Sequence, residues 1–268
     1  MDGDGVTTVL IHANRSKAAA DAAERRLVDE ARAVGLGVAK AGGQADVVVA
    51  LGGDGTFLKA VHEHPGLPVL GLNIGGLGYL ASVGEDGFAS ALRCLADGAF
   101  TISERSLIEA GGRFAALNDI VVTRELTGHA ARLDLFADGK LVTRYMADGL
   151  IFATPTGSTA YSLAAGGPVL MPDSRSFVVT PLNPHALGVR PIVVSDRVRL
   201  SVVARPRTDG NQVRAGVYAD GENVMTLGEG ESVEIARSER TAKIVELEGY
   251  DPYGVLARKL GWSGSNVS

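Results

Sequence analysis

Five apolar residues in a row, Val47–Leu51, lead directly into the segment Gly52-Gly53-Asp54-Gly55-Thr56. An uninterrupted apolar run of this length is typical of a strand covered on both faces, as in a parallel sheet. Three glycines then surround one carboxylate, and a helical pattern follows over Phe57–Glu63. Glycines let a backbone approach an anion closely, and a helix N-terminus favours negative charge. The segment therefore predicts an α/β fold with an anion-binding turn at the end of a parallel strand.

The first third of the chain alternates strand-like and helix-like segments around this turn. Val6–His12 and Pro68–Leu72 are predicted strands, whereas Ser16–Val34 and Glu85–Asp97 are predicted helices. A repeated strand–helix–strand order is typical of a doubly wound parallel sheet. We therefore expect residues 1–99 to form an α/β domain.

From about Phe100 onward, strand-like segments follow one another, and one short helix near Thr159–Ala165 interrupts them. Asp138-Gly139 has the composition of a two-residue hairpin turn, and Asp220-Gly221 resembles another. We expect a β-rich domain over residues 100–246, with residues 247–268 packing back onto the first domain. The predicted strands are Ile120–Arg124, Arg132–Phe136, Leu141–Met146, Leu150–Thr154, Phe177–Thr180, Pro191–Val194, Arg199–Ala204, Ala215–Ala219 and Ser232–Ile235, and a helix is predicted over Pro252–Leu260.

Composition excludes several classes of protein. The chain has 268 residues, 46% of them hydrophobic, which is enough to bury a core. Its net charge of -5 argues against a nucleic-acid binder, which usually has a basic face. A single cysteine, Cys94, excludes an intrachain disulfide and a multi-cysteine metal site. Because no signal-like pattern or apolar run of transmembrane length is present, we expect a soluble cytoplasmic protein with no membrane partner.

Turn-forming and polar residues gather in four segments at strand ends, which is where open α/β sheets place their sites. Beside a bound phosphate, the Asp54 carboxylate would be repelled unless it binds a metal or accepts a proton. Ordinary turns or helix capping are the alternative for each segment, but the six turn-type residues of Thr154–Thr159 exceed what capping needs. The four segments are Gly52–Thr56, Asn118-Asp119, Asp148–Tyr161 and Asp220-Gly221-Glu222.

Other nucleotide-binding and catalytic motifs do not occur in the sequence. It has neither the P-loop pattern G-x-x-x-x-G-K-[ST] nor a G-x-S-x-G nucleophile elbow. Gly76–Ala81 matches G-x-G-x-x-A, but no capped helix follows at once, and we interpret it as a chance match in a glycine-rich chain. His62 and His64 flank Glu63, but residues two apart do not share a helix face. We therefore expect a solvated helix end there and no metal site.

Together these segments resemble the NAD kinase family. The family's pattern is a GGDG loop, an Asn-Glu/Asp pair, a D-G-x-x-x-x-T-P-T-G-S-T-A-Y block, a T-P-x-x-P-H segment and a D-G turn. The GGDG loop is shared with phosphofructokinases and with diacylglycerol and sphingosine kinases, so the block is what makes the resemblance specific. The matching residues are Gly52–Gly55, Asn118-Asp119, Asp148–Tyr161, Thr180–His185 and Asp220-Gly221, and Lys259–Trp262 is similar to the family's closing segment.

The resemblance implies a Rossmann-like α/β domain and a β-rich NAD-binding domain, with the substrate bound in the crevice between them. It also implies a homodimer or homotetramer, and Asp54 as the general base. The residues that it assigns to the nucleotide are Gly53, Gly55, Thr56, Lys59, Asn73, Tyr79, Asn118, Asp119, His129, Asp148, Thr156, Ser158, Thr159, Ala160, Tyr161, Ser162, Leu163, Ala164, Asp220 and Glu222.

Three positions depart from the family's pattern. Gly76 and Met146 stand where relatives commonly carry a basic residue, and Ala186 stands where Ser is common. The first two departures remove positive charge near the expected phosphates. They therefore bear on substrate preference and on the choice of phosphate donor.

The implied reaction transfers the γ-phosphoryl of ATP, or a phosphoryl of polyphosphate, to the 2′-hydroxyl of the adenosine ribose of NAD, which makes NADP. Mg²⁺ carried with the ATP would neutralise the phosphates, and no protein-held metal is expected. Two alternatives stay open: a kinase of the same superfamily with a lipid or another nucleoside as acceptor, and a nucleotide-binding sensor without catalysis. The Thr154–Tyr161 block favours NAD over the first, and Asp54 argues against the second.

Overall fold

The computed structural model describes residues 6–14, 18–40, 42–76, 78–125, 130–206 and 214–262. The chain forms two compact units, residues 1–104 with 242–268 and residues 105–241. The sequence predicted domain boundaries at residues 99 and 246. The two compact units divide within two long strands, Phe100–Ala110 and Ser232–Leu247, each of which has residues in both units.

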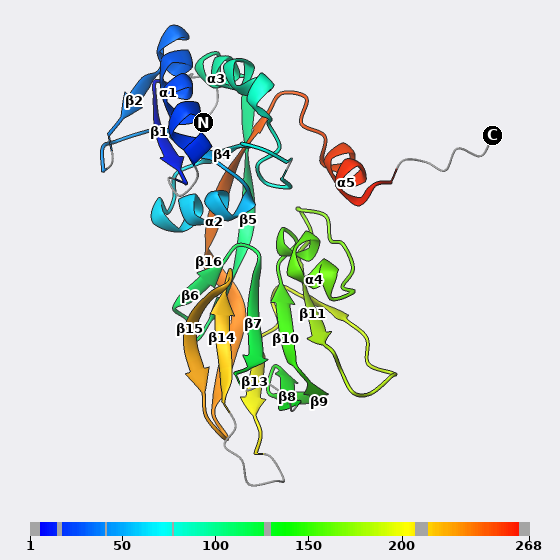
Figure 1. Cartoon of the computed structure of the whole chain (residues 1–268). Coiled ribbons are helices and arrows are strands. Elements are labelled where there is room, and N and C mark those ends of the chain that lie inside the picture. The colour runs from blue at the N-terminus through cyan, green and yellow to red at the C-terminus, as the bar shows by residue number, and fades with distance from the viewer. Residues whose placement is uncertain are drawn as a thin grey trace, which may run out of the picture. The chain divides into compact units, whose positions relative to one another are not determined.

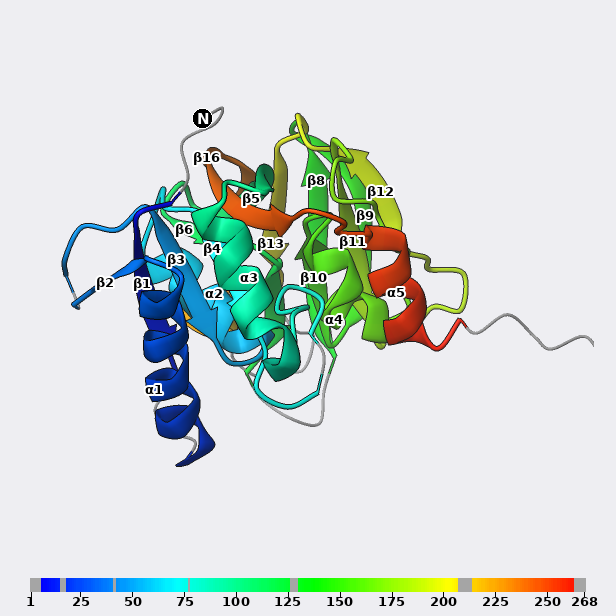
Figure 2. The same ribbon diagram turned by 90° about the horizontal axis from the view of Figure 1, so that it is seen from above.

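The elements appear in chain order along the colour ramp of Figures 1 and 2. They are β1 (Thr8–Ala13), α1 (Ala18–Ala33), β2 (Gly37–Ala39), β3 (Val47–Leu51), α2 (Asp54–Glu63), β4 (Val69–Leu72), η1 (Glu85–Gly87), α3 (Phe88–Ala96), β5 (Phe100–Ala110), β6 (Phe114–Ala116), β7 (Asp119–Arg124), β8 (Ala131–Ala137), β9 (Lys140–Ala147), β10 (Gly149–Ala153), η2 (Gly157–Thr159), α4 (Tyr161–Ala164), β11 (Ser176–Leu182), β12 (Ile192–Ser195), β13 (Leu200–Ala204), β14 (Ala215–Ala219), β15 (Glu222–Leu227), β16 (Ser232–Leu247) and α5 (Pro252–Leu260).

The first unit is built on a parallel sheet in the order β2-β1-β3-β4, with the end of β16 beside β4. All five residues of β3 are buried, as the uninterrupted apolar run Val47–Leu51 predicts for a covered strand. Helices α1 and α3 lie side by side on this sheet (Figures 1 and 2). They bury Leu27 and Leu92 against Leu51 and Leu72 in one apolar cluster. This packing fixes the end of β3, where the glycine-rich turn begins.

The second unit is a pair of antiparallel sheets around one core. One sheet has the order β12-β11-β10-β7-β14-β15, and the other continues from β16 through β13 and β8 to β9. Ile120 and Phe152 of the first sheet belong to the same buried cluster as Leu133 and Val202 of the second. The central strand β10 is buried along its whole length. The β-rich character predicted from the sequence is therefore confirmed.

Both predicted hairpin turns are present. Asp138 and Gly139 have φ values of 47° and 76° between β8 and β9. Asp220 and Gly221 have φ values of 46° and 87° between β14 and β15. Two successive positive φ angles match the right-handed twist of the flanking strands, and Asp-Gly accepts them at low cost.

Several elements differ from the sequence-based expectations. Strands β2, β5, β6 and β15 were not predicted, β16 extends to Leu247, and α2 begins at Asp54 instead of Phe57. The unpredicted β5 and β15 mix apolar residues with adjacent charged or polar ones, although only two residues of each strand are exposed, and this hides the apolar signal. Within the described ranges, no helix is long and apolar enough to cross a membrane.

Candidate active site

The glycine-rich turn delivers Asp54 to the first position of α2. A Cβ atom at Gly52 would collide with the hydroxyl of the buried Thr56, so the close turn between β3 and α2 requires glycine. The N-cap residue Gly53 has no side chain, and no side-chain hydrogen bond caps the helix. The first amide groups of a helix have no partner within the helix, and they favour an anion. The turn therefore leaves an anion-binding helix start beside a carboxylate.

A loop from β4 holds the Asp54 carboxylate through backbone amides. Oδ2 accepts a hydrogen bond from Tyr79 N–H at 3.0 Å, and Oδ1 accepts from Leu80 N–H at 3.0 Å and Ala81 N–H at 3.1 Å. A Cβ at Gly78 would collide with Oδ1, so glycine is required there as well. An ionised carboxylate has about four acceptor positions. Three amides leave Oδ2 of Asp54 one position for a substrate hydroxyl.

Asn73 and Tyr79 both belong to this loop after β4. The Asn73 side chain is buried, and its amide nitrogen donates to Gly76 O at 2.8 Å and Ala81 O at 3.2 Å. Both of its N–H groups are thus used within the loop, and its contribution to a ligand would be indirect. Burial, and then the Asp54 charge, raise the pKa of Tyr79, and the Lys259 ammonium lies 5.5 Å from its ring centroid.

In the second unit, the Asp220 carboxylate binds the start of β7. It accepts hydrogen bonds from Leu117 N–H at 2.7 Å, Asn118 N–H at 2.8 Å and Asp119 N–H at 3.2 Å. The sequence assigned Asp220 to the nucleotide. Its carboxylate holds the backbone that presents the Asn118-Asp119 pair.

Asp119 is a buried carboxyl next to Asp220. Burial, with the Asp220 charge as the second cause, raises the pKa of Asp119 from 3.8 to about 7. Near neutral pH this side chain therefore exchanges between a form that donates a hydrogen bond and a form that only accepts.

The hydroxyl groups of the Thr154–Tyr161 block mostly stabilise the block itself. Thr154 donates to Leu117 O at 2.5 Å, Ser158 donates to Pro155 O at 2.7 Å, and Thr159 donates to Thr156 O at 3.0 Å. The N-cap residues of η2 and α4 make no side-chain capping bond, but the Thr154 hydroxyl accepts a hydrogen bond from Gly157 N–H at 3.0 Å at the start of η2. Among the described residues, none supplies a hydrogen bond to the hydroxyls of Thr156 and Tyr161.

The block packs directly on the Asn118-Asp119 pair. Thr154 N–H donates to Asn118 O at 2.9 Å. A Cβ at Gly157 would collide with this same Asn118 carbonyl, so only glycine lets the two segments approach. Ser162 and Thr180, both fully buried, share a hydrogen bond of 2.8 Å behind the block. The second unit thus brings together two of the polar segments that lie far apart in the sequence.

Asp148 and Tyr161 line one pocket of about 200 Å³ in the second unit. Asp148 Oδ1 lies 2.9 Å from Arg124 Nε, and Oδ2 accepts from Asn183 Nδ2 at 2.9 Å. Arg124 and Asn183 were missed by sequence reasoning, since a lone Arg at a strand end carries no motif. The full lining is Thr123, Arg124, Glu125, Asp148, Tyr161, Leu182 and Asn183.

The other predicted residues fall in three groups. Lys59, Gly55 and Glu222 are exposed, and among the described residues none has a side-chain contact that ties it to the groups above. His129 lies outside the described residues. Ala160, Ser162, Leu163 and Ala164 lie in or beside the short helix α4, with Ser162 buried and its hydroxyl bonded to Thr180.

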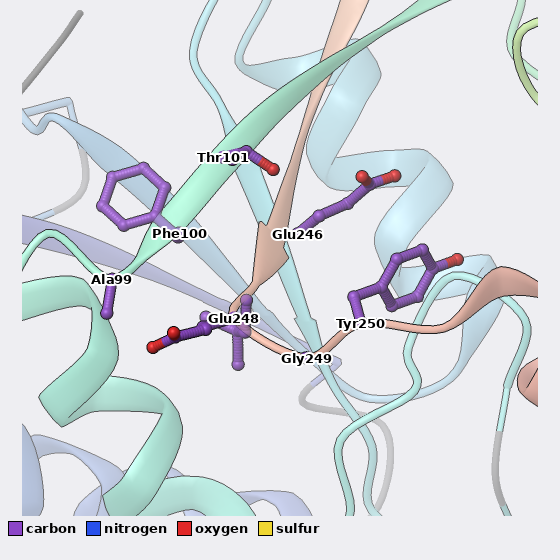
Figure 3. A pocket seen from close by; sticks show the side chains of 8 residues that line it. Ala99, Phe100, Thr101, Glu246, Glu248, Gly249 and Tyr250 are labelled. Atoms are coloured by element: carbon purple, nitrogen blue, oxygen red, sulfur yellow. The ribbon is translucent and has the colours of Figure 1, made fainter.

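A larger pocket, of about 390 Å³, lies elsewhere in the first unit. It is lined by residues 99–101 and 246–250, and none of the predicted site residues contributes to it. Figure 3 shows Glu246 and Tyr250 on one side of the end of β16 and Phe100 on the other. Carboxylates in the wall disfavour a phosphate, so this pocket is not the candidate active site.

An α/β unit with a carboxylate in a GGDG loop, followed in the chain by a β-rich unit, defines a two-domain kinase of the GGDG-loop class. The model of the ATP-NAD kinase N-terminal domain matches residues 8–100, and that of the ATP-NAD kinase C-terminal domain matches residues 117–247. The chain therefore belongs to the NAD kinase family.

Individual relatives agree with this membership. The NAD kinase of Symbiobacterium thermophilum is 40% identical over 229 residues, covering 81% of this chain and 79% of that protein. The NAD kinase of Syntrophotalea carbinolica is 36% identical over 230 residues, covering 82% and 79%. The structure of an Archaeoglobus fulgidus NAD kinase in complex with ATP has a TM-score of 0.80 at 25% identity, over 96% of this chain and 100% of that one. Yeast NADH kinase complexed with NADH shares the fold, with a TM-score of 0.86 at 22% identity over 97% and 89%.

Proposed function

We propose that this chain is an NAD kinase that transfers the γ-phosphoryl of ATP to the 2′-hydroxyl of the adenosine ribose of NAD and makes NADP. The observation that carries the proposal is the Asp54 carboxylate, which three backbone amides hold at the start of α2. A carboxylate fixed in this way can accept a hydrogen bond from an alcohol in one defined direction. Relatives that cover most of the chain are named NAD kinase.

In the proposed reaction, the 2′-oxygen attacks the γ-phosphorus as the bond to the β,γ-bridging oxygen breaks, and ADP leaves. The hydroxyl proton passes to Oδ2 of Asp54, the atom with a spare acceptor position, and from there to solvent. Phosphoryl transfer depends mainly on positioning and on neutralising charge. General-base assistance contributes roughly 10²–10⁴ in rate. ATP enters as its Mg²⁺ complex, and the cation supplies the neutralisation that the chain's few basic site residues do not.

The second unit would hold the dinucleotide. Thr156 and Tyr161 offer hydroxyls without partners among the described residues, and Asp148 and Tyr161 line a pocket that an amide-bearing ring could enter. Asn118 and Asp119 are fixed by Asp220 and by the block, which keeps their side chains in register for a substrate. A site with such dedicated polar groups rejects analogues that lack the matching atoms.

We also propose that the protein assembles as a homodimer or homotetramer through the second unit. Leu141, Val142 and Met146 on β9 are more than 40% exposed, as is Val193 on β12, and Leu187 is 94% exposed. All five residues belong to the second unit, and a contiguous exposed apolar patch is typical of a protein interface. Light scattering coupled to size-exclusion chromatography should give two or four chains for the wild type and a smaller assembly for Leu187→Asp. A wild-type monomer would contradict the assembly.

One experiment tests the function. Phosphate transfer from ATP is followed against NAD, NADH, NADP, 2′-deoxy-NAD, diacylglycerol, sphingosine and fructose 6-phosphate, with and without Mg²⁺, and with polyphosphate as a second donor. We expect NAD to be phosphorylated only with the divalent cation, and NADP and 2′-deoxy-NAD to be inert. Phosphorylation of 2′-deoxy-NAD would mean that the acceptor hydroxyl is wrong. A faster reaction with a lipid or a sugar would overturn the assignment to NAD.

A further inference from the structure

A cluster of metal-binding side chains lies at the C-terminal end of α2, at the opposite end of this helix from Asp54. His12 comes from β1, Glu63 is the last residue of α2, and His64 is its C-cap. One ligand atom from each lies within 4.8 Å of the other two. The sequence places His12 far from the other two, so their meeting is visible only in the structure. We propose that this His12–Glu63–His64 cluster is a binding site for Zn²⁺.

The geometry matches a metal ion better than a direct contact. His12 Nδ1 lies 3.7 Å from Glu63 Oε2, which is too long for a hydrogen bond. The two imidazole rings meet edge to face, with centroids 5.5 Å apart and planes at 80°. With bonds of about 2.0–2.1 Å, the ligand atoms of a tetrahedral zinc site lie roughly 3.3 Å apart. The ligand atoms lie within 4.8 Å of one another, so they must close by at most about 1.5 Å to reach this spacing, and the Glu63 side chain, which is 62% exposed, has room to rotate inward.

The ligand types select the metal. Two imidazoles and one carboxylate are a common zinc ligand set, and they leave the fourth tetrahedral position to water. Mg²⁺ prefers oxygen ligands and keeps its waters, so the Mg²⁺ that accompanies ATP should not compete for this site. Lys59, one helical turn before Glu63, is exposed and can turn away from a bound cation.

Backbone structure holds the three side chains in place. His64 N–H donates to Ala60 O at 3.0 Å, which closes the last turn of α2. His12 lies opposite Ala50 in the β1–β3 pairing, and β3 leads into α2 through the glycine-rich turn. A bound ion would therefore tie β1 to the far end of the helix that begins at Asp54, within one compact unit (Figure 1).

Zinc binding to the untagged full chain, stripped with a chelator, tests the site by calorimetry. We expect one Zn²⁺ per chain with a Kd tighter than about 10 µM, unaffected by millimolar Mg²⁺. Loss of a group that only orients a metal ligand costs about 10–100-fold in metal affinity, so loss of a direct ligand should cost at least about 100-fold. His12→Gln, Glu63→Gln and His64→Gln should each show that loss. The matched control is His62→Gln, which removes a neighbouring imidazole that is not part of the cluster.

Co²⁺ in place of Zn²⁺ gives a second readout, because a tetrahedral site yields an intense visible absorption band. The band should appear with the wild type and with His62→Gln, and should be missing in His64→Gln. Glu63 and His64 lie at a helix end, so their variants test the site even if the half-buried His12→Gln fails to fold. Wild-type binding weaker than about 100 µM would overturn the proposal. An equal loss in His62→Gln, or unchanged affinity in Glu63→Gln and His64→Gln, would do the same.

Discussion

The raised pKa of Asp119 predicts that the protein loses stability as the pH rises toward neutrality. In the unfolded chain this carboxyl has a pKa of 3.8, and in the folded chain burial and Asp220 raise it to about 7. Between these values the folded state holds a proton that the unfolded state has released. The stabilisation is therefore complete below the unfolded pKa and is lost as the pH rises through about 7.

The size of the effect follows from the two pKa values. Each unit of difference corresponds to about 1.4 kcal/mol, so the full span from 3.8 to about 7 is roughly 4 kcal/mol. Between pH 5 and pH 8 the loss is about 2–3 kcal/mol. In a chain of this size, that corresponds to a fall of roughly 5 °C or more in the unfolding midpoint.

The perturbation is Asp119→Asn, which keeps the shape of the side chain and removes its titration. The assay is the unfolding midpoint at pH 5, 6, 7 and 8, measured with a chelator present and without nucleotide. The wild type should become less stable relative to Asp119→Asn as the pH rises. The pKa of His12 is lowered chiefly by desolvation, so its contribution to stability rises with pH near the lower end of this range. It is present in both proteins and cancels in the difference.

Asp97→Asn is the matched control, because Asp97 is an exposed carboxyl at the end of α3. Its stability should follow the wild type at every pH. If Asp119→Asn also follows the wild type across the range, burial does not raise the pKa of Asp119, and the reasoning is refuted.

Three further predictions concern the proposed site. Asp54→Asn should lower kcat by more than about 100-fold, with a small loss of stability because one amide would face an N–H instead of an oxygen; a kcat above a tenth of wild type would exclude the base role. Gly78→Ala should lower kcat because its Cβ meets the Asp54 carboxylate, whereas Gly76→Ala, with open space around its Cβ, should not. Equal kcat values for the two variants would contradict the conclusion that the loop fixes the Asp54 carboxylate. Asn118→Ala should weaken NAD binding by roughly 1–3 kcal/mol with little change in unfolding midpoint, and an unchanged KM with lower stability would indicate a turn-forming role only.

Much of the fold could be predicted from the sequence because the central elements are strongly patterned. The continuous apolar runs at Val47–Leu51 and in β10 mark strands that are buried in both units. Strands β5 and β15 could not be predicted in this way, because adjacent polar and charged residues, such as Ser103–Ser106, interrupt their alternation. The end of β16 was missed for a related reason, since Arg237–Lys243 carries several charges and its only apolar residue is Ala242.

The site could be predicted as a set of segments, but the roles of individual side chains could not. Glycine-rich turns and strand ends are readable in sequence, so the segments that carry Asp54 and Asn118 could be singled out. Whether a side chain faces a ligand or its own backbone depends on partners that are distant in the chain. Asn73 is used by its own loop, and Asp220 by residues 117–119, about a hundred positions earlier. Arg124 and Asn183 join Asp148 only through tertiary structure.

Asp54 and Asp220 each hold a segment of backbone through a carboxylate, one in each unit, and this explains why both positions need a carboxylate. Each is followed by glycine, and each accepts hydrogen bonds from three backbone amides. An asparagine would replace one accepting oxygen with a donor and would lose part of the set. At Asp54 the fixed charge faces the start of a helix, where it can serve an incoming hydroxyl. At Asp220 the fixed charge faces the buried Asp119 and helps to raise its pKa. The Asp220 charge that holds the start of β7 therefore also helps to raise the pKa of Asp119. Substitutions at Asp220 should change the pH dependence of stability as well as the fold.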